Sequence, residues 1–174
     1  MHVIGASNTR GLSHFLQSGS IDTTVFVNPG CGFNVLKDRT SHMLSEDTDV
    51  AVLHLGTNDV LCSTTDGQCM LQCNEALDKI ESTHQQHRPN VPLFVCSVPP
   101  TRVKRNQWRV DMLNALLWTR CQKSRHLHFL ETGVSLQDIG RDGIHLTPEG
   151  KAKLATAIVN SVQDFHLPSN KTGK

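Results

Sequence analysis

The order of short apolar runs and longer helical patterns constrains this chain more than any other feature of its sequence. Five short runs, rich in Val, Leu and Phe, show little alternation between apolar and polar residues. Such runs are typical of parallel strands that are covered on both faces. The runs span residues 2–4, 24–27, 50–55, 93–98 and 126–130.

Helical patterns lie between and after these runs. They span residues 9–17, 35–44, 66–87, 106–124 and 148–165. The last pattern has Thr147 as a cap, Pro148 in its first turn and an apolar stripe that includes Leu154 and Ile158. This alternation predicts an α/β fold, a flavodoxin-like three-layer α/β/α sandwich with a five-stranded parallel sheet.

Length, charge and cysteine content limit the class of protein. The 174 residues suit one domain, and the net charge of +1 gives no case for a nucleic-acid or membrane partner. No apolar run is long enough to predict a membrane span. The six cysteines show no zinc-binding spacing with histidines, so we expect reduced thiols in an intracellular, cytoplasmic protein without a metal. We expect the domain to occupy residues 1–166 and residues 167–174 to be disordered.

A polar or glycine-containing segment follows each predicted strand. Ser7 lies in the first of them, GASNTRG, and the others are NPGCGFN, GTNDV, PPTRVKRNQ and RDGIHLTPEG. On its own segment, Ser7 is either the cap of the following helix or a nucleophile. The carboxyl ends of parallel strands meet at one edge of the sheet, so all five segments are expected there. That convergence favours the nucleophile, because a cap does not require it.

A base and its partner are available in the segment DGIH. Asp142 and His145 stand three residues apart, a spacing that brings carboxylate and imidazole side by side in a helical turn. His145 could then take the proton of Ser7, while Asp142 fixes the tautomer of the ring.

Attack on an ester carbonyl builds negative charge on oxygen, and three hydrogen-bond donors are candidates to stabilise it. They are the backbone N–H of Ser7, the backbone N–H of Gly30 and the side-chain amide of Asn58. Gly32 remains an alternative to Gly30, because NPGCGF contains both glycines. We prefer Gly30, since Val35 and Leu36 then fall where the following helix is expected.

Four segments, in this order, resemble the sequence blocks of the SGNH (GDSL-like) hydrolase family. They are GASNTRG, NPG, GTND and DGIHLTPEG, and they extend over residues 5–150. The resemblance implies the SGNH hydrolase fold and ester hydrolysis without a cofactor. It also implies the roles of Ser7 as nucleophile, His145 as base, Asp142 as its orienter, and Ser7, Gly30 and Asn58 as oxyanion donors. The family usually has Asp before the serine, where this sequence has Ala6.

The resemblance also implies the substrates. The family acts on esters that include acetylated sugars, lipids and thioesters, and its acetylhydrolases of the platelet-activating-factor type suggest short acyl groups, acetyl above all. A narrower resemblance, carried by VLHLGTNDV, is to the esterase domain in the first open reading frame of non-LTR (LINE-type) retrotransposons. It implies a longer, self-associating protein whose other domains contact nucleic acid.

Two other functions remain open. A catalytically weak module on the same fold could bind a lipid or a protein partner in the pocket. A basic segment after the fourth strand, Arg102 to Arg109, surrounds Trp108 and could contact an anionic lipid, a membrane surface or RNA. We favour a solvated basic loop with Trp108 packed on the helix below it.

Three further residues are assigned structural roles. Trp118 is expected in the core with the leucines of its helix, and His54 is expected to be a buried histidine with its hydrogen bonds satisfied. Cys31 adjoins Gly30, but no base lies near it in the sequence, so we do not expect it to be a nucleophile.

Overall fold

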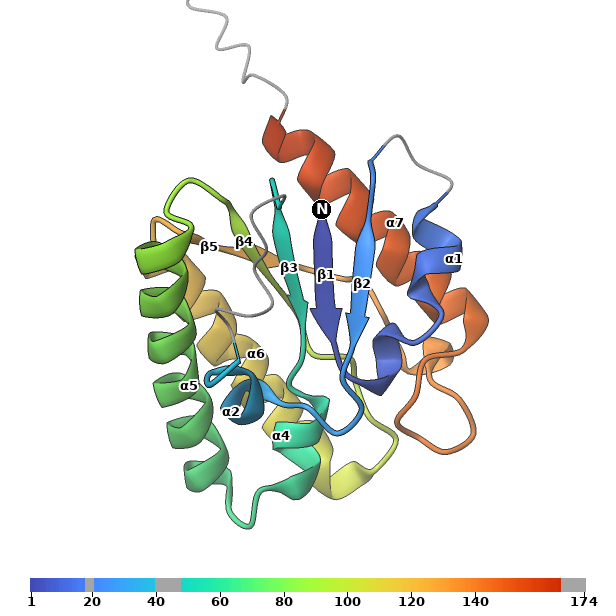
Figure 1. Ribbon diagram of the computed structural model, residues 1–174. Coiled ribbons are helices and arrows are strands. Elements are labelled where there is room, and N and C mark those ends of the chain that lie inside the picture. The colour runs from blue at the N-terminus through green and yellow to red at the C-terminus, as the bar shows by residue number, and fades with distance from the viewer. Residues whose placement is uncertain (18–20, 40–47, 167–174) are drawn as a thin grey trace, which may run out of the picture.

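The computed structural model describes residues 1–17, 21–39 and 48–166, and it contains one parallel sheet (Figure 1). Its strands lie in the order β2-β1-β3-β4-β5, and every pair of neighbours is parallel. The strands are β1 (His2–Gly5), β2 (Thr24–Val27), β3 (Ala51–His54), β4 (Leu93–Cys96) and β5 (Leu127–Leu130). The predicted five-stranded parallel sheet is therefore confirmed.

Helices cover both faces of this sheet, as Figure 1 shows. They are η1 (Ser7–Thr9), α1 (Leu12–Leu16), α2 (Phe33–Leu36), α4 (Thr57–Cys62), α5 (Asp66–His87), α6 (Lys104–Lys123), η2 (Leu136–Asp138) and α7 (Pro148–His166), where η marks a 3-10 helix. α1 contacts α7 on one face, and α5 contacts both α2 and α6 on the other. The molecule is the three-layer α/β/α sandwich that the sequence predicts.

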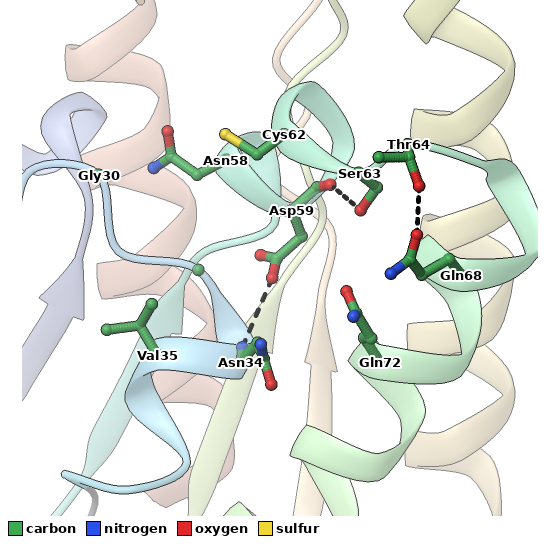
Figure 2. Close-up of a pocket in the computed structure, with 11 residues that line it drawn as sticks. Gly30, Asn34, Val35, Asn58, Asp59, Cys62, Ser63, Thr64, Gln68 and Gln72 are labelled. Atoms are coloured by element: carbon green, nitrogen blue, oxygen red, sulfur yellow. Dashed lines mark hydrogen bonds between the residues drawn. The ribbon is translucent and has the colours of Figure 1, made fainter.

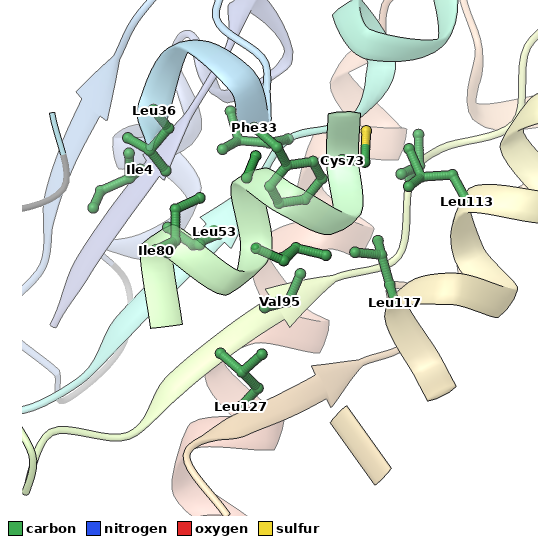
Figure 3. Packing of buried hydrophobic residues seen from close by; sticks show 14 of the residues in the cluster. Ile4, Phe33, Leu36, Leu53, Cys73, Ile80, Val95, Leu113, Leu117 and Leu127 are labelled. Carbon is green, nitrogen blue, oxygen red and sulfur yellow. The ribbon is translucent and has the colours of Figure 1, made fainter. Parts of the chain in front are cut away.

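Successive residues of the central strands enter two separate cores. Val3 and Val52 pack with α1 and α7, whereas Ile4 and Leu53 pack with α2, α5 and α6. Figure 3 shows part of the second of these cores. Because both faces of each central strand are buried, their sequences are apolar without alternation.

Three helical segments differ from the sequence prediction. The helix expected at 9–17 is two short helices, η1 and α1, which are separated by Gly11 at a φ of 76°. The helix expected at 35–44 begins earlier, at Phe33, and part of its expected range lies outside the described residues. α4 occupies the segment GTNDV, which was expected to be a loop. The expected disordered tail also lies outside the described residues.

The expectation that Trp118 lies in the core is wrong. Leu113 and Leu117 of α6 are fully buried, but Trp118 is 53% exposed. It follows Leu117 directly, and a helix turns by about 100° per residue, so the two side chains leave α6 in different directions.

None of the helices described reaches the length and apolarity that crossing a bilayer requires.

Candidate active site

Ser7 is the first residue of η1, and only Ala6 separates it from the end of β1. The turn is tight because Gly5 has no side chain: a Cβ there would lie 2.1 Å from Cγ2 of Thr9. Thr9 closes the turn, since its N–H and hydroxyl both donate to the carbonyl of Ala6, at 3.0 and 2.6 Å. The interpretation of Ser7 as a helix cap is wrong, because Ala6 and Gly11 occupy the cap positions of η1 and α1.

The hydroxyl of Ser7 instead contacts His145. Ser7 Oγ lies 2.9 Å from His145 Nε2, and His145 Nδ1 lies 2.6 Å from Asp142 Oδ2. This arrangement lets the neutral ring donate from Nδ1 to Asp142 and accept the proton of Ser7 at Nε2. The structure thus brings together three of the residues that the sequence singled out.

The turn that carries Asp142 and His145 is not helical, contrary to the reasoning from spacing. Gly143 has a φ of 78°, and Asp142 Oδ1 accepts from the backbone N–H groups of Ile144 and His145 at 3.0 and 2.9 Å. The N–H of His145, that of Ile144 and then the ring lower the pKa of Asp142 to about 2. A short polar loop therefore achieves what the helical spacing predicted.

Three neighbouring segments hold this turn in place. Gly140 N–H donates to the carbonyl of His145 at 2.7 Å, and Thr101 Oγ1 and Arg102 N–H both donate to the carbonyl of Gly143, at 2.9 Å.

Asn8, next to Ser7, accepts the N–H of Leu146 through Oδ1 at 3.0 Å. Asn8 is 3% exposed and links the loop of the nucleophile to the loop of the base. Sequence reasoning did not single out Asn8, and its position beside Ser7 was the only available signal.

Two of the three proposed oxyanion donors, Asn58 and Gly30, follow the two strands that flank β1. Asn58 lies in the first turn of α4, after β3, and its Nδ2 donates to the carbonyl of Cys31 at 2.9 Å. Gly30 lies after β2 at a φ of 76°, a conformation that favours glycine. Both residues line a cavity of about 290 Å³, shown in Figure 2. Ser7 and His145 are not among the described residues that line it.

Gly32 lines the same cavity but is placed differently. It is the N-cap of α2, and a Cβ there would lie 2.4 Å from both carboxylate oxygens of Asp59. Asp59 accepts the N–H of Phe33 at 3.0 Å and that of Asn34 at 3.5 Å. Gly32 thus allows close packing of α2 against α4, whereas Gly30 is exposed.

The basic segment divides into structural and exposed side chains. Arg109 pairs with Asp66 at 2.5 Å and donates to the carbonyls of Val60 and Ser63, so it anchors α6 to α4 and α5. Trp108 is 63% exposed, so the expectation that it packs on the helix is wrong.

Cys31 and His54 are buried near this edge of the sheet. Cys31 is buried, and burial, followed by the charge of Asp59, raises the pKa of its thiol, which disfavours the thiolate. His54 is buried, as expected, but neither ring nitrogen has a hydrogen-bond partner in the described part of the chain. The expectation that the hydrogen bonds of His54 are satisfied is therefore wrong.

Within the described ranges, no group of His, Cys, Asp or Glu side chains is arranged to hold a metal ion.

The sequence matches the GDSL-like lipase/acylhydrolase family over residues 6–153. The chain belongs to this family. Its class of activity is therefore that of a carboxylic ester hydrolase. A comparison with curated protein sequences finds no match.

Solved structures of esterases share the fold at low sequence identity. A GDSL-like lipase from Bacteroides thetaiotaomicron is 15% identical with a TM-score of 0.76, over 94% of this chain and 87% of the other. A family 3 carbohydrate esterase from Clostridium thermocellum is 18% identical with a TM-score of 0.71, over 95% and 96%. An acetyl xylan esterase is 14% identical with a TM-score of 0.76, over 93% and 100%.

Proposed function

We propose that this GDSL-like hydrolase is a serine esterase that removes short acyl groups, acetyl above all, from their esters. The observation that carries the proposal is the hydrogen-bonded chain from Ser7 Oγ through His145 to Asp142. A serine hydroxyl is a weak nucleophile until a neighbouring base takes its proton, and His145 is such a base, held in a suitable orientation by Asp142.

The reaction proceeds in two steps. Ser7 Oγ attacks the ester carbonyl carbon as its proton passes to His145 Nε2, and His145 then gives that proton to the departing alcohol oxygen. A water molecule, deprotonated by His145, attacks the acyl-serine, and His145 returns that proton to Ser7 Oγ as the carboxylic acid leaves. Asp142 keeps Nδ1 protonated and stabilises the imidazolium, without taking the proton itself.

Three N–H donors stabilise the negative oxygen of each tetrahedral intermediate in this proposal: the backbone N–H groups of Ser7 and Gly30 and the amide of Asn58. Asn58 has two amide hydrogens, so the one that does not bond to Cys31 is free for this role. The bond to Cys31 also fixes the amide beside the turn that carries Gly30. Such pre-oriented donors are typically worth a factor of about 10² to 10³ each.

The preference for short acyl groups rests on the shape and chemistry of the surroundings. The cavity beside Asn58 is lined mainly by polar side chains, with Val35 and Cys62 as exceptions, which does not suit a long alkyl chain. The acetyl xylan esterase that shares the fold supports an acetyl group as the acyl part of the substrate.

The narrower resemblance to a retrotransposon esterase domain stays a prediction, because the matched family is the general one.

The test is hydrolysis of p-nitrophenyl esters of increasing acyl length by the wild type, Ser7→Ala and His145→Ala. We expect the highest kcat/KM for the acetate, and a loss of about 10⁴-fold or more in either variant. Ser82→Ala is the matched control, because Ser82 is an exposed serine of α5 far along the chain from the site. Equal activity in the wild type and Ser7→Ala would refute the mechanism and favour a binding module.

A further inference from the structure

The candidate base is held in place mainly through its backbone. The side chains of His145 and Asp142 are 49% and 52% exposed, so little packing restrains the imidazole ring. Among the described residues, the ring forms hydrogen bonds with Ser7 and Asp142 alone. The position of the ring relative to Ser7 therefore depends on where the backbone around His145 lies.

One buried hydrogen bond joins that backbone to the loop of the nucleophile. Asn8 Oδ1 accepts the N–H of Leu146 at 3.0 Å. Asn8 is the residue after Ser7. Leu146 is the residue after His145, so the bond connects the immediate neighbours of the reacting pair. Asn8 is 3% exposed and Leu146 is 6% exposed, so little water can compete for the bond.

The other bonds of the base loop, residues 139–147, restrain this separation less. Those from Gly140, Thr101 and Arg102 come from segments that do not carry the nucleophile. Apart from the catalytic contact, the described residues show one further hydrogen bond between the two regions, from Lys151 Nζ to the carbonyl of Arg10 at 2.9 Å. It is exposed, and its donor ends a long, flexible side chain.

Apolar packing brings the two loops together without setting their separation. Leu146 lies in the same core as Leu12 of α1. Apolar contacts have no direction, whereas an N–H···O bond is confined to about 2.7–3.2 Å and weakens steeply when it bends. A carboxamide suits this buried position, because it supplies an acceptor without a charge that burial would penalise.

We propose that Asn8 is a positioning residue of the esterase. Through its bond to Leu146 it sets the separation of the reacting atoms, Ser7 Oγ and His145 Nε2. The assignment rests on the proposed function, because it concerns the reaction of that same site. His145 has to reach the serine oxygen and the departing alcohol oxygen in turn, and a displacement of about 1 Å can cost about 10²-fold in rate. Asn8 is too deeply buried to contact the substrate, so substrate binding does not depend on it.

Asn8→Leu removes the acceptor and keeps a side chain of similar size. We expect kcat for p-nitrophenyl acetate to fall about 10- to 100-fold, with KM within about twofold of the wild-type value. Asn8→Asp keeps an acceptor oxygen in either protonation state, so it should recover kcat to within about fivefold of the wild type. If Asn8→Leu does not fold, the smaller Asn8→Ala replaces it with the same expectation.

Ser124→Ala is the control for a loss of stability alone. Ser124 Oγ accepts the N–H groups of His126 and Leu127 at 2.9 and 3.0 Å, where β5 begins, at the edge of the sheet opposite the candidate site. This variant should unfold at lower urea concentration than the wild type and keep the wild-type kcat. Hydrogen exchange at the Leu146 amide should be faster in Asn8→Leu than in Ser124→Ala, which verifies that the intended bond is lost.

Three results would overturn the proposal in an active wild type. They are a kcat of Asn8→Leu within about twofold of the wild type, equal losses of kcat in Asn8→Leu and Ser124→Ala, and a kcat of Asn8→Asp as low as that of Asn8→Leu. Failure of the proposed function looks different, because the wild type itself would then cleave no ester. The positioning role would fall with it in that case.

Discussion

Asp142 is bound through both carboxylate oxygens inside the turn that carries His145. The backbone N–H of His145, that of Ile144 and the ring of His145 lower the pKa of Asp142 to about 2. Asp142 therefore remains a carboxylate at every pH above about 4. A loss of activity in mildly acidic solution would therefore have to come from a group other than Asp142.

Asp142→Asn tests this arrangement. The amide cannot accept from His145 Nδ1–H through its nitrogen, and the ring is free to turn or to change tautomer. We expect kcat for p-nitrophenyl acetate to fall by about 10²- to 10⁴-fold with little change in KM. Asp164→Asn, an exposed aspartate of α7, is the control. An unchanged kcat in Asp142→Asn would show that His145 does not need this partner.

Single residues could be predicted from the sequence where chemistry restricts the choice. Ser7, Asp142 and His145 are reactive residue types in segments that parallel strands bring together, so they could be singled out without a structure. Asn8 could not, because its link to Leu146 depends on how two loops approach each other. The exposure of Trp118 could not be predicted either, because a large apolar residue beside buried leucines is normally expected in the core.

At the scale of elements, α4 connects the sheet to the candidate oxyanion donors. Its first turn carries Asn58, which holds the carbonyl of Cys31, and Asp59, which holds the first N–H groups of α2. Burial raises the pKa of Asp59, and the backbone N–H groups of Phe33 and Asn34 oppose this rise. Two adjacent residues of one short helix thus fix the segment that contains Gly30.

Asp59→Ala should loosen that segment. Two N–H groups at the start of α2 would lose their acceptor, so we expect the free energy of unfolding to fall by about 1–2 kcal/mol. The kcat/KM for p-nitrophenyl acetate should fall as well, because Gly30 would no longer be held. Urea unfolding and ester hydrolysis measure the two effects, with Asp164→Ala as the control. Lost activity at unchanged stability would contradict a structural role and indicate direct contact with the substrate.

The elements that could be predicted are those with a clear apolar signal. The strands and the long helices α5, α6 and α7 were found because their patterns extend over enough residues to be distinctive. α4 was missed, because Gly56, Thr57, Asn58 and Asp59 are residue types that also favour turns. Its helical form depends on packing against α5 and α6, which no local pattern contains.

At the scale of the whole molecule, the sheet separates two cores, and both depend on strands that carry few polar groups. His54, at the end of β3, is one of these polar groups. It is 2% exposed, and side-chain alternation places it on the same face as Val52. Burial lowers its pKa to about 4, so the native protein holds this ring neutral. In the unfolded chain the same ring has an ordinary histidine pKa of about 6.5.

This difference couples the stability of the whole domain to pH. Between about pH 6.5 and pH 4 the unfolded chain binds the proton of His54 and the native protein does not, so stability falls as the pH falls. The loss due to His54 is as much as about 3 kcal/mol across this window, and none is expected above it. In His54→Leu, which has a similar volume and no titrating group, the drop in unfolding free energy from pH 7 to pH 4 should be smaller by that amount. Urea unfolding at a series of pH values measures it, and His14→Leu, an exposed histidine of α1, is the control. The same pH dependence in His54→Leu and the wild type would show that the ring is not held neutral in the native protein.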